Sequence, residues 1–136
     1  MPFLIELLRE KVAHMTKWME HEKQAIRMLI GERLPKNVLE DVLGSDRCVL
    51  DYDGHGYCVT AEDDRLPVER DVFDGPANDF LIGSSPSRLE CGYVVFVMNR
   101  QLTLDCHPWG DPLPPEFRES KVDIRLSPKG KTAPRR

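Results

Sequence analysis

The chain has 136 residues, of which 40% are hydrophobic and 31% are charged. This composition is typical of a soluble globular protein and argues against a disordered or membrane-embedded one. The length suits one domain whose core needs no disulfide or metal support. With 23 acidic against 19 basic side chains the formal net charge is −4, and no basic stripe marks a nucleic-acid binder, so we expect no nucleic-acid partner.

Charge is distributed unevenly along the chain. Residues 1–44 carry seven basic and seven acidic side chains, residues 45–119 carry six and fifteen, and residues 120–136 carry six and one. The middle of the chain is therefore strongly negative and its end is positive. Charge of this kind bears on partners rather than on the fold, and it predicts attraction to a basic protein surface.

No targeting signal is recognisable near the N-terminus. Residues 2–8 are apolar apart from Glu6, and the charges that follow end the run well short of the ~20 residues that a membrane span needs. The order of charge, apolar stretch and small-residue cleavage site of a secretory signal is also missing. We therefore expect a cytoplasmic protein that does not associate with membranes.

Four cysteines occur at irregular spacing, without a C-x-x-C pair. They are Cys48, Cys58, Cys91 and Cys106. This spacing indicates neither a zinc ribbon nor a disulfide framework. We expect reduced core thiols, no metal ion and no cofactor.

The first third of the chain is predicted to be helical. Apolar side chains recur at three- and four-residue steps between residues 4 and 29, which is helical periodicity. We expect a helix over residues 18–31, preceded by a shorter N-terminal helix, although residues 3–30 could also form one helix. Met15, Trp18 and Met19 are expected in the core. Residues 35–43 are predicted as a second short helix, because Pro stands at its start and Gly44 just past its end.

After Gly44 the period of the apolar residues changes from about 3.6 to 2, which predicts strands. The sequence Asp53-Gly54 is a hairpin turn signal. Strands are predicted over residues 48–52, 55–61, 68–73, 91–98, 102–106 and 122–126. Residues 74–88 are rich in Gly, Pro and Ser and are predicted as a loop, with a turn around residues 80–82. The strand over 91–98 is apolar on both faces and is therefore expected at the centre of the sheet.

Helices followed by hairpin-linked strands predict an α+β fold. We expect the N-terminal helices to pack on one face of an antiparallel sheet of about five or six strands. Residues 1–126 would form a single domain, with helices within 1–44 and the sheet within 45–126. Residues 127–136 are predicted as a basic, disordered tail.

Three segments together carry a resemblance: DYDGHGYCVT at 51–60, CGYVVFV at 91–97 and LTLDCHPWGD at 102–111. They resemble a family of small bacterial α+β proteins of uncharacterised function, over about three quarters of the chain from Met19 to Ile124. Proteins of that kind occur in the cytoplasm beside toxin or secretion genes. The resemblance implies an immunity-type role and carries over no catalytic residues.

The segment Asp105-Cys106-His107 holds the residues best suited to catalysis. On a strand, Asp105 and His107 share one face, while Cys106 points to the other, so a Cys-His nucleophile pair is disfavoured. His107, Asp105 and His55 could instead build a hydrolase-like or metal-dependent site if they converge in a pocket. A histidine that simply hydrogen-bonds at the end of a strand is the plainer interpretation.

Acidic and aromatic side chains are interleaved between residues 51 and 80. Acidic groups steer a basic partner, and aromatic groups supply buried contacts. We predict a non-catalytic protein-binding module, in the form of an immunity protein that neutralises a basic toxin. Its predicted contact residues are Tyr52, Asp53, His55, Tyr57, Asp63, Asp64, Asp71, Asp74 and Trp109. The enzyme at His107 and a structural module remain the alternatives, and the oligomeric state stays open.

Overall fold

Antiparallel strands and two helices build the fold seen in the computed structural model, which describes residues 15–75 and 78–129. Over these residues the sheet has eight strands, in the order β1-β2-β3-β7-β6-β5-β8, with β4 paired to β6 beside β5. The strands are β1 (Met15–Thr16), β2 (Cys48–Tyr52), β3 (Tyr57–Glu62), β4 (Asp71–Phe73), β5 (Asp79–Ser84), β6 (Glu90–Met98), β7 (Gln101–Pro108) and β8 (Asp123–Pro128). The expected α+β class is confirmed, with more strands than predicted.

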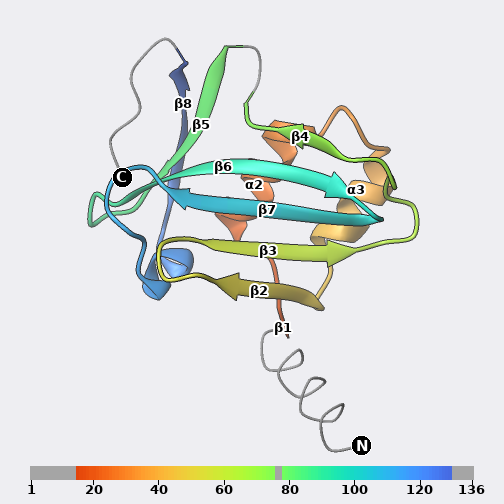
Figure 1. The fold of residues 1–136 in the computed structure, drawn as a ribbon, viewed down its shortest axis with the longest axis horizontal. Coiled ribbons are helices and arrows are strands. Elements are labelled where there is room, and N and C mark those ends of the chain that lie inside the picture. The colour runs from red at the N-terminus through yellow and green to blue at the C-terminus, as the bar shows by residue number, and fades with distance from the viewer. Residues whose placement is uncertain (1–14, 76–77, 130–136) are drawn as a thin grey trace, which may run out of the picture.

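Both helices cover the same face of the sheet (Figure 1). They are α2 (Glu20–Ile30) and α3 (Lys36–Leu43), and a 3₁₀ helix, η1 (Pro115–Glu119), follows the long hairpin of β6 and β7. The opposite face, which we call the open face, is turned toward the viewer and carries no helix in the described part of the chain. Neither helix is long and apolar enough to cross a membrane.

Helix α2 begins two residues later than predicted. The backbone N–H of Met19 donates to the Glu22 carboxylate at 2.8 Å, which is one half of a capping box and sets the helix start. Trp18 is buried as expected, and its indole N–H donates to the Val42 carbonyl of α3 at 2.9 Å. The placement of Met15 in a helical core was wrong: Met15 lies in β1 and is 38% exposed. The shorter N-terminal helix was predicted over residues that lie mostly outside the described part.

The two-residue alternation of the strands decides which side chains reach the helices. Tyr57, Val59 and Ala61 of β3 are buried, as are Leu102 and Leu104 of β7. Strand β6 is central, as predicted, because it pairs with β7 along its length and with β5 and β4 on its other edge. The residues between the buried ones therefore point to the open face.

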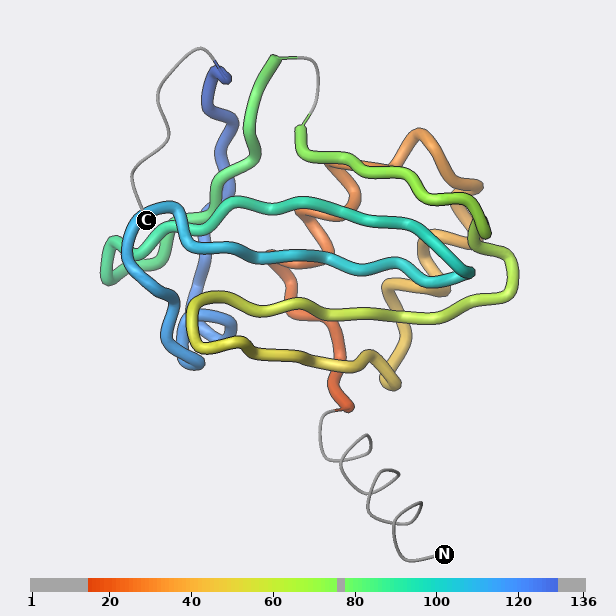
Figure 2. Tube along the Cα trace, viewed as in Figure 1, coloured from red at the N-terminus to blue at the C-terminus, as the bar shows by residue number. Residues whose placement is uncertain are grey.

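The loop predicted over residues 74–88 was wrong in part, because it contains β5. This strand pairs with the start of β6 and, over six residues, with β8 (Figure 2). A Cβ on Gly83 of β5 would lie 2.5 Å from the Tyr93 hydroxyl oxygen, so the glycine makes room for that ring. The predicted tail also began too early, since Ser127 and Pro128 belong to β8; residues 130–136 lie outside the described part.

A buried polar network ties α2 to the sheet and to η1. The Arg118 guanidinium donates to both carboxylate oxygens of Glu22, at 2.8 and 3.0 Å, and the Tyr57 hydroxyl donates to the same carboxylate at 2.7 Å. Glu22 is fully buried, and Arg118 is 6% exposed. His21 stands beside this pair, with Nε2 2.9 Å from the Arg118 carbonyl oxygen and Nδ1 2.7 Å from the Tyr93 hydroxyl. Because a carbonyl only accepts, Nε2 carries the proton and the tyrosine donates to Nδ1.

Burial of His21 predicts a pH-dependent stability. Burial lowers the pKa of His21 below its usual 6.5, against the smaller opposing effects of the Arg118 carbonyl and Glu22. Between the lowered pKa and 6.5 the unfolded chain binds a proton that the folded chain does not. The free energy of unfolding should therefore fall as the pH drops below 6.5, by at most about 1.4 kcal/mol per pH unit for this one proton. Urea unfolding between pH 7.5 and 5 measures the slope, and His21→Gln should flatten it; an unchanged slope in this variant would contradict the assignment.

Candidate functional site

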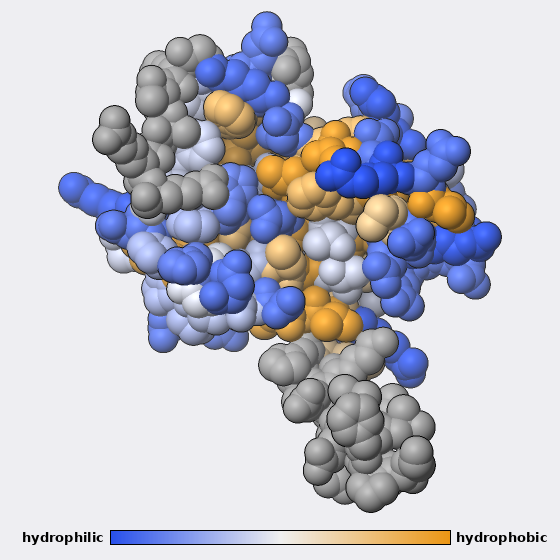
Figure 3. Space-filling view, in the orientation of Figure 1, coloured by the Kyte–Doolittle hydropathy of each residue, from blue (hydrophilic) through white to orange (hydrophobic). Residues whose placement is uncertain are grey.

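The open face presents its side chains in rows across the strands. Asp51 of β2, Cys58 of β3, Asp105 of β7 and Val94 of β6 are in register and form one row. In the same orientation as Figure 1, Figure 3 shows apolar side chains gathered over β4 and β6, with polar ones around them. This face therefore offers both apolar and acidic contacts to the solvent.

His107 lies at the end of β7 that adjoins the β2–β3 hairpin turn. Its Nδ1 is 3.0 Å from Asp105 Oδ2, and the two side chains are 19% and 30% exposed. The two-residue spacing predicted that they share a face, and this is confirmed. The imidazole lies over Gly92 of β6, where a Cβ would come within 2.4 Å of His107 Nε2. Gly92 thus leaves the space that the ring fills.

Two cavities flank His107. The larger, about 580 Å³, is lined by Asp53, His55, Asp105 and His107 together with the loop after β7, and we call it the Asp105 cavity. His55 belongs to the turn between β2 and β3, and the antiparallel pairing of β3 with β7 brings that turn beside His107. The three residues of the enzyme alternative therefore line one cavity.

The Asp53 carboxylate organises the turn that forms this rim. It accepts hydrogen bonds from the backbone N–H groups of Gly56 and His55, both at 2.8 Å. These bonds lower the pKa of Asp53, and the bond from Gly56 has the larger effect. Asp53 therefore keeps its negative charge at the mouth of the Asp105 cavity.

Cys58 lies in this row between Asp51 and Asp105, and its thiol donates to Asp105 Oδ1 at 3.3 Å. Burial raises the pKa of Cys58 to about 12, with further contributions from Asp105, Asp51 and Asp53. A thiol with such a pKa stays protonated at neutral pH and is a poor nucleophile. Cys106 is fully buried on the helix-covered face and is no nucleophile either.

The smaller cavity, about 240 Å³, lies where β5 turns away from β6, and we call it the Trp109 cavity. Phe80, Val94, His107 and Trp109 line it, with Asp74 at its edge. The centroids of the Phe80 and Trp109 rings are 5.1 Å apart, and the centroid of His107 is 6.3 Å from that of Trp109. This cavity is therefore largely aromatic.

Substituting Gly92 tests whether His107 is held as described. In Gly92→Ala the new methyl group would occupy the space of the imidazole, so we expect His107 to turn away and its hydrogen bond to Asp105 to be lost. Imidazole ¹⁵N shifts of His107 measure this loss. Because the displaced group is the end of a side chain on the open face, the free energy of unfolding should change little. Unaltered imidazole shifts would contradict this arrangement.

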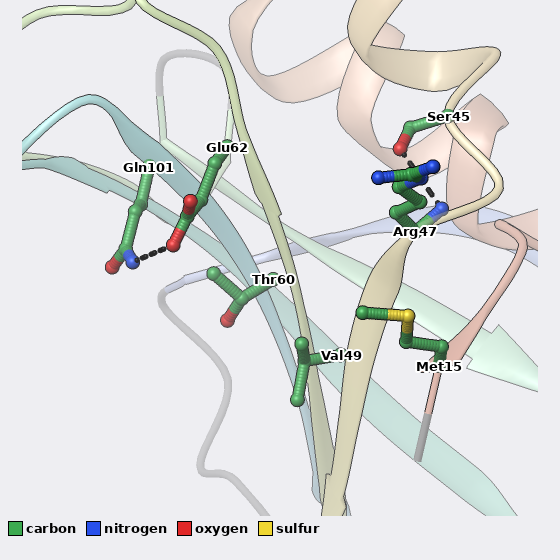
Figure 4. Close-up of a pocket in the computed structure, with 7 residues that line it drawn as sticks. All are labelled: Met15, Ser45, Arg47, Val49, Thr60, Glu62 and Gln101. Atoms are coloured by element: carbon green, nitrogen blue, oxygen red, sulfur yellow. Dashed lines mark hydrogen bonds between the residues drawn. The ribbon is translucent and has the colours of Figure 1, made fainter. Parts of the chain in front are cut away.

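A third cavity opens at the other end of the open face, beside β1 (Figure 4). Two hydrogen bonds join polar groups of its lining. Gln101 donates to Glu62 at 2.8 Å, and the Arg47 backbone N–H donates to the Ser45 hydroxyl at 3.1 Å. Among the described residues its lining has no aromatic ring and no acid–base cluster, and we assign it no role.

The structure separates the predicted contact residues. Asp53, His55 and Trp109 lie at the His107 end, and Tyr52 joins them through a hydrogen bond from its hydroxyl to the Leu113 carbonyl at 2.7 Å. Tyr57 was wrongly placed on the surface. It is 5% exposed and bonded to Glu22, because the alternation of β3 turns it toward the helices with Val59.

The remaining predicted residues lie elsewhere. Asp63 and Asp64 follow β3 at the opposite end of the sheet, and Arg65 lowers the pKa of Asp63 to about 2 through a hydrogen-bonded ion pair. Asp71 is exposed at the start of β4. Asp74 pairs with Lys129 at 2.9 Å. The expected continuous acidic surface is thus divided, and part of its charge is neutralised.

Sequence reasoning did not place Phe80, which lines the Trp109 cavity, beside Lys129, whose ammonium lies over the Phe80 ring. Phe80 was assigned to a loop, and Lys129 to a disordered tail. Their proximity depends on the pairing of β5 with β8, where Phe80 faces Ser127, and no local pattern indicates it. The register that sets Asp51 opposite Cys58 was missed as well, because the turn spans residues 53–56, whereas a two-residue turn at Asp53-Gly54 would place Asp51 opposite Gly56.

The chain matches no family model, no curated protein and no solved structure. The resemblance to small bacterial immunity-type proteins stays a prediction.

Proposed function

We propose that this protein is a non-catalytic binding module whose open face, at the His107 end, binds a basic protein such as a toxin. The acidic row and the two cavities beside His107 form the contact surface. Binding there neutralises the partner by covering its basic surface. The proposed contact surface is confined to the His107 end and is therefore smaller than the acidic surface predicted from the sequence.

One observation carries this proposal: three acidic groups at this end face the solvent without a Lys or Arg partner among the described residues. Within residues 15–75 and 78–129, neither Asp51 nor Asp53 forms an ion pair with Lys or Arg, and Asp105 pairs only with His107. Burial first, and then the three carboxylates, raise the pKa of Cys58. Carboxylates without a Lys or Arg partner attract a basic surface and direct its approach.

The aromatic and apolar side chains beside the row suit a protein partner. Trp109 and Phe80 are partly exposed next to the acidic groups, and Val72 and Met98, farther along the same face, are 38% and 44% exposed. Interfaces combine central aromatic anchors with charged rims. A small basic metabolite would need only the cavity, whereas this face extends well beyond it.

A charge reversal within the row tests the proposal. Asp51→Lys should weaken binding of an octalysine peptide about 30-fold at 0.1 M salt, since a charge change of two units next to a bound cation costs roughly 1 kcal/mol per unit. Asp64→Lys is the matched control. Glu62 is about 13 Å from Cys58 along β3, and Asp64 lies beyond Glu62. Asp64 is therefore farther from the row than the Debye length of about 10 Å. Its effect should stay below about twofold.

Isothermal titration calorimetry measures both variants, and binding should weaken further as salt rises to 1 M. Native-cell extracts passed over the immobilised protein and the Asp51→Lys variant then identify the partner, which should be basic and retained by the unmodified protein alone. Equal octalysine affinities for the two variants would refute the proposal. So would a native partner that binds regardless of salt.

The enzyme alternative has one observation in its favour, the convergence of Asp105, His107 and His55 on one cavity. Asp105 orients His107 through Nδ1, as in an acid–base pair. However, Nε2 lies against Gly92, and the nearby Cys58 thiol stays protonated. Among the described residues no three His, Cys, Asp or Glu side chains group to hold a metal ion. Hydrolysis of ester and phosphate substrates that disappears in His107→Gln would establish this alternative instead.

A further inference from the structure

We propose that the Trp109 cavity is a lysine-binding site and that the protein's own Lys129 occupies its mouth until a lysine side chain of the partner displaces it. This inference rests on the proposed function and adds a specific contact to it. The site is the Trp109 cavity, the ligand group is a lysine ammonium, and the internal competitor is Lys129.

The position of Lys129 shows which chemistry suits this site. Its ammonium lies 5.4 Å from the centroid of the Phe80 ring and 2.9 Å from Asp74 Oδ1. An ammonium within about 6 Å of an aromatic centroid gains a cation–π interaction, and the carboxylate adds a charge-assisted hydrogen bond. Phe80 and Asp74 both line the Trp109 cavity, so Lys129 contacts two residues of its lining.

The rest of the Trp109 cavity offers a similar aromatic environment. Trp109 stands against Phe80 with 5.1 Å between ring centroids, and His107 forms the next wall. A volume of about 240 Å³ admits the end of a further lysine side chain. An incoming ammonium there can face Trp109, which is the aromatic ring with the strongest attraction for cations.

Lys129 is held weakly enough to be replaced. Its side chain is 31% exposed and that of Asp74 is 50% exposed, and exposed ion pairs of this kind contribute little. The residue follows the end of β8, where its backbone N–H donates to the Asn78 carbonyl at 2.7 Å. Because Lys129 competes for the site, the apparent affinity for an added ligand equals its intrinsic affinity multiplied by the fraction of molecules whose site is free.

The test uses Nα-acetyl-lysine methylamide as the probe and the indole N–H resonances of the two tryptophans as the readout. Trp109 lines the site, whereas buried Trp18 donates its indole N–H to Val42 and serves as an internal control. Titration should shift the Trp109 resonance and leave that of Trp18 in place. The acetyl-norleucine analogue has the same chain without the charge, and it should shift neither resonance.

Variants of the full-length chain then separate the contributions of the competitor and of the cavity residues to probe binding. Lys129→Ala should raise the probe affinity about threefold or more by removing the competitor, whereas Lys121→Ala, which removes the same charge from an exposed position, should not. Asp74→Asn should lower the affinity, and Trp109→Leu should abolish binding. An unshifted Trp109 resonance in Lys129→Ala, or equal effects of both lysine variants, would overturn the inference.

Failure of this inference and failure of the proposed function are distinguishable. If octalysine binding responds to Asp51→Lys but not to Trp109→Leu, the basic partner stands and the lysine site is refuted. If the lysine probe binds as described and no basic protein does, the lysine site stands and the proposed function is refuted.

Discussion

Replacing Arg118 with methionine is expected to lower the free energy of unfolding by about 3–5 kcal/mol, because it leaves a buried charge without its partner. The guanidinium contacts both oxygens of Glu22, which has no exposed surface, and it also donates to the Thr16 hydroxyl and the Lys17 carbonyl. One side chain of η1 thus joins α2 and the segment before it. Urea unfolding followed by circular dichroism measures the loss.

Two further variants show whether the buried pair is the cause. The double variant Glu22→Leu/Arg118→Met removes both charges, so its loss should be smaller than the sum of the two single losses. Arg27→Met breaks the exposed pair with Glu40 and should leave the unfolding midpoint almost unchanged. Equal losses in Arg118→Met and Arg27→Met would show that burial of the pair does not matter.

Substituting Gly83 is expected to give the second large effect. The added methyl group of Gly83→Ala would lie 2.5 Å from the Tyr93 hydroxyl and 2.7 Å from Val122. Tyr93 is 1% exposed and bonded to His21, so it has little room to move. We expect the free energy of unfolding to fall by about 1–3 kcal/mol through overpacking.

Gly92→Ala is the matched control, because it adds the same methyl group to the neighbouring strand on the opposite face. There the clash is with the movable ring of His107. The Gly83 variant should lose clearly more stability than the Gly92 variant in the same urea experiment. The reverse order would mean that the helix-covered side of β5 is less tightly packed than the structure indicates.

Local patterns were sufficient for the elements that surround the site. The change of period after Gly44, the turn at Asp53-Gly54 and the apolar stretch of β6 predicted most strands close to their observed bounds. The alternation of β7 placed Asp105 and His107 on one face and Cys106 on the other. The same rule, applied to β3, puts Tyr57 on the face of Val59, which conflicts with the choice of Tyr57 as a contact residue.

Long-range pairing decided the features that local patterns missed. Strand β5 has few strand-forming residues beyond Phe80, Leu81 and Ile82, and it is extended because β6 and β8 supply its hydrogen bonds. Its pairing with β8 brings Lys129 beside Phe80. Similarly, Glu22 and Arg118 are 96 residues apart and meet only when η1 packs against α2.

The sequence by itself determined the α+β class, the central strand, the helix-covered and open faces of β3 and β7, and the negative charge of the middle segment. These follow from side-chain periodicity and composition, which act over a few residues. Only the tertiary structure decided that the acidic residues divide between two ends of the sheet, that His55 and His107 line one cavity, and that Phe80, Trp109 and Asp74 line another with Lys129 in contact with two of them. The physical reason is that strand order and register place residues distant in the chain side by side, and these depend on the packing of the whole sheet.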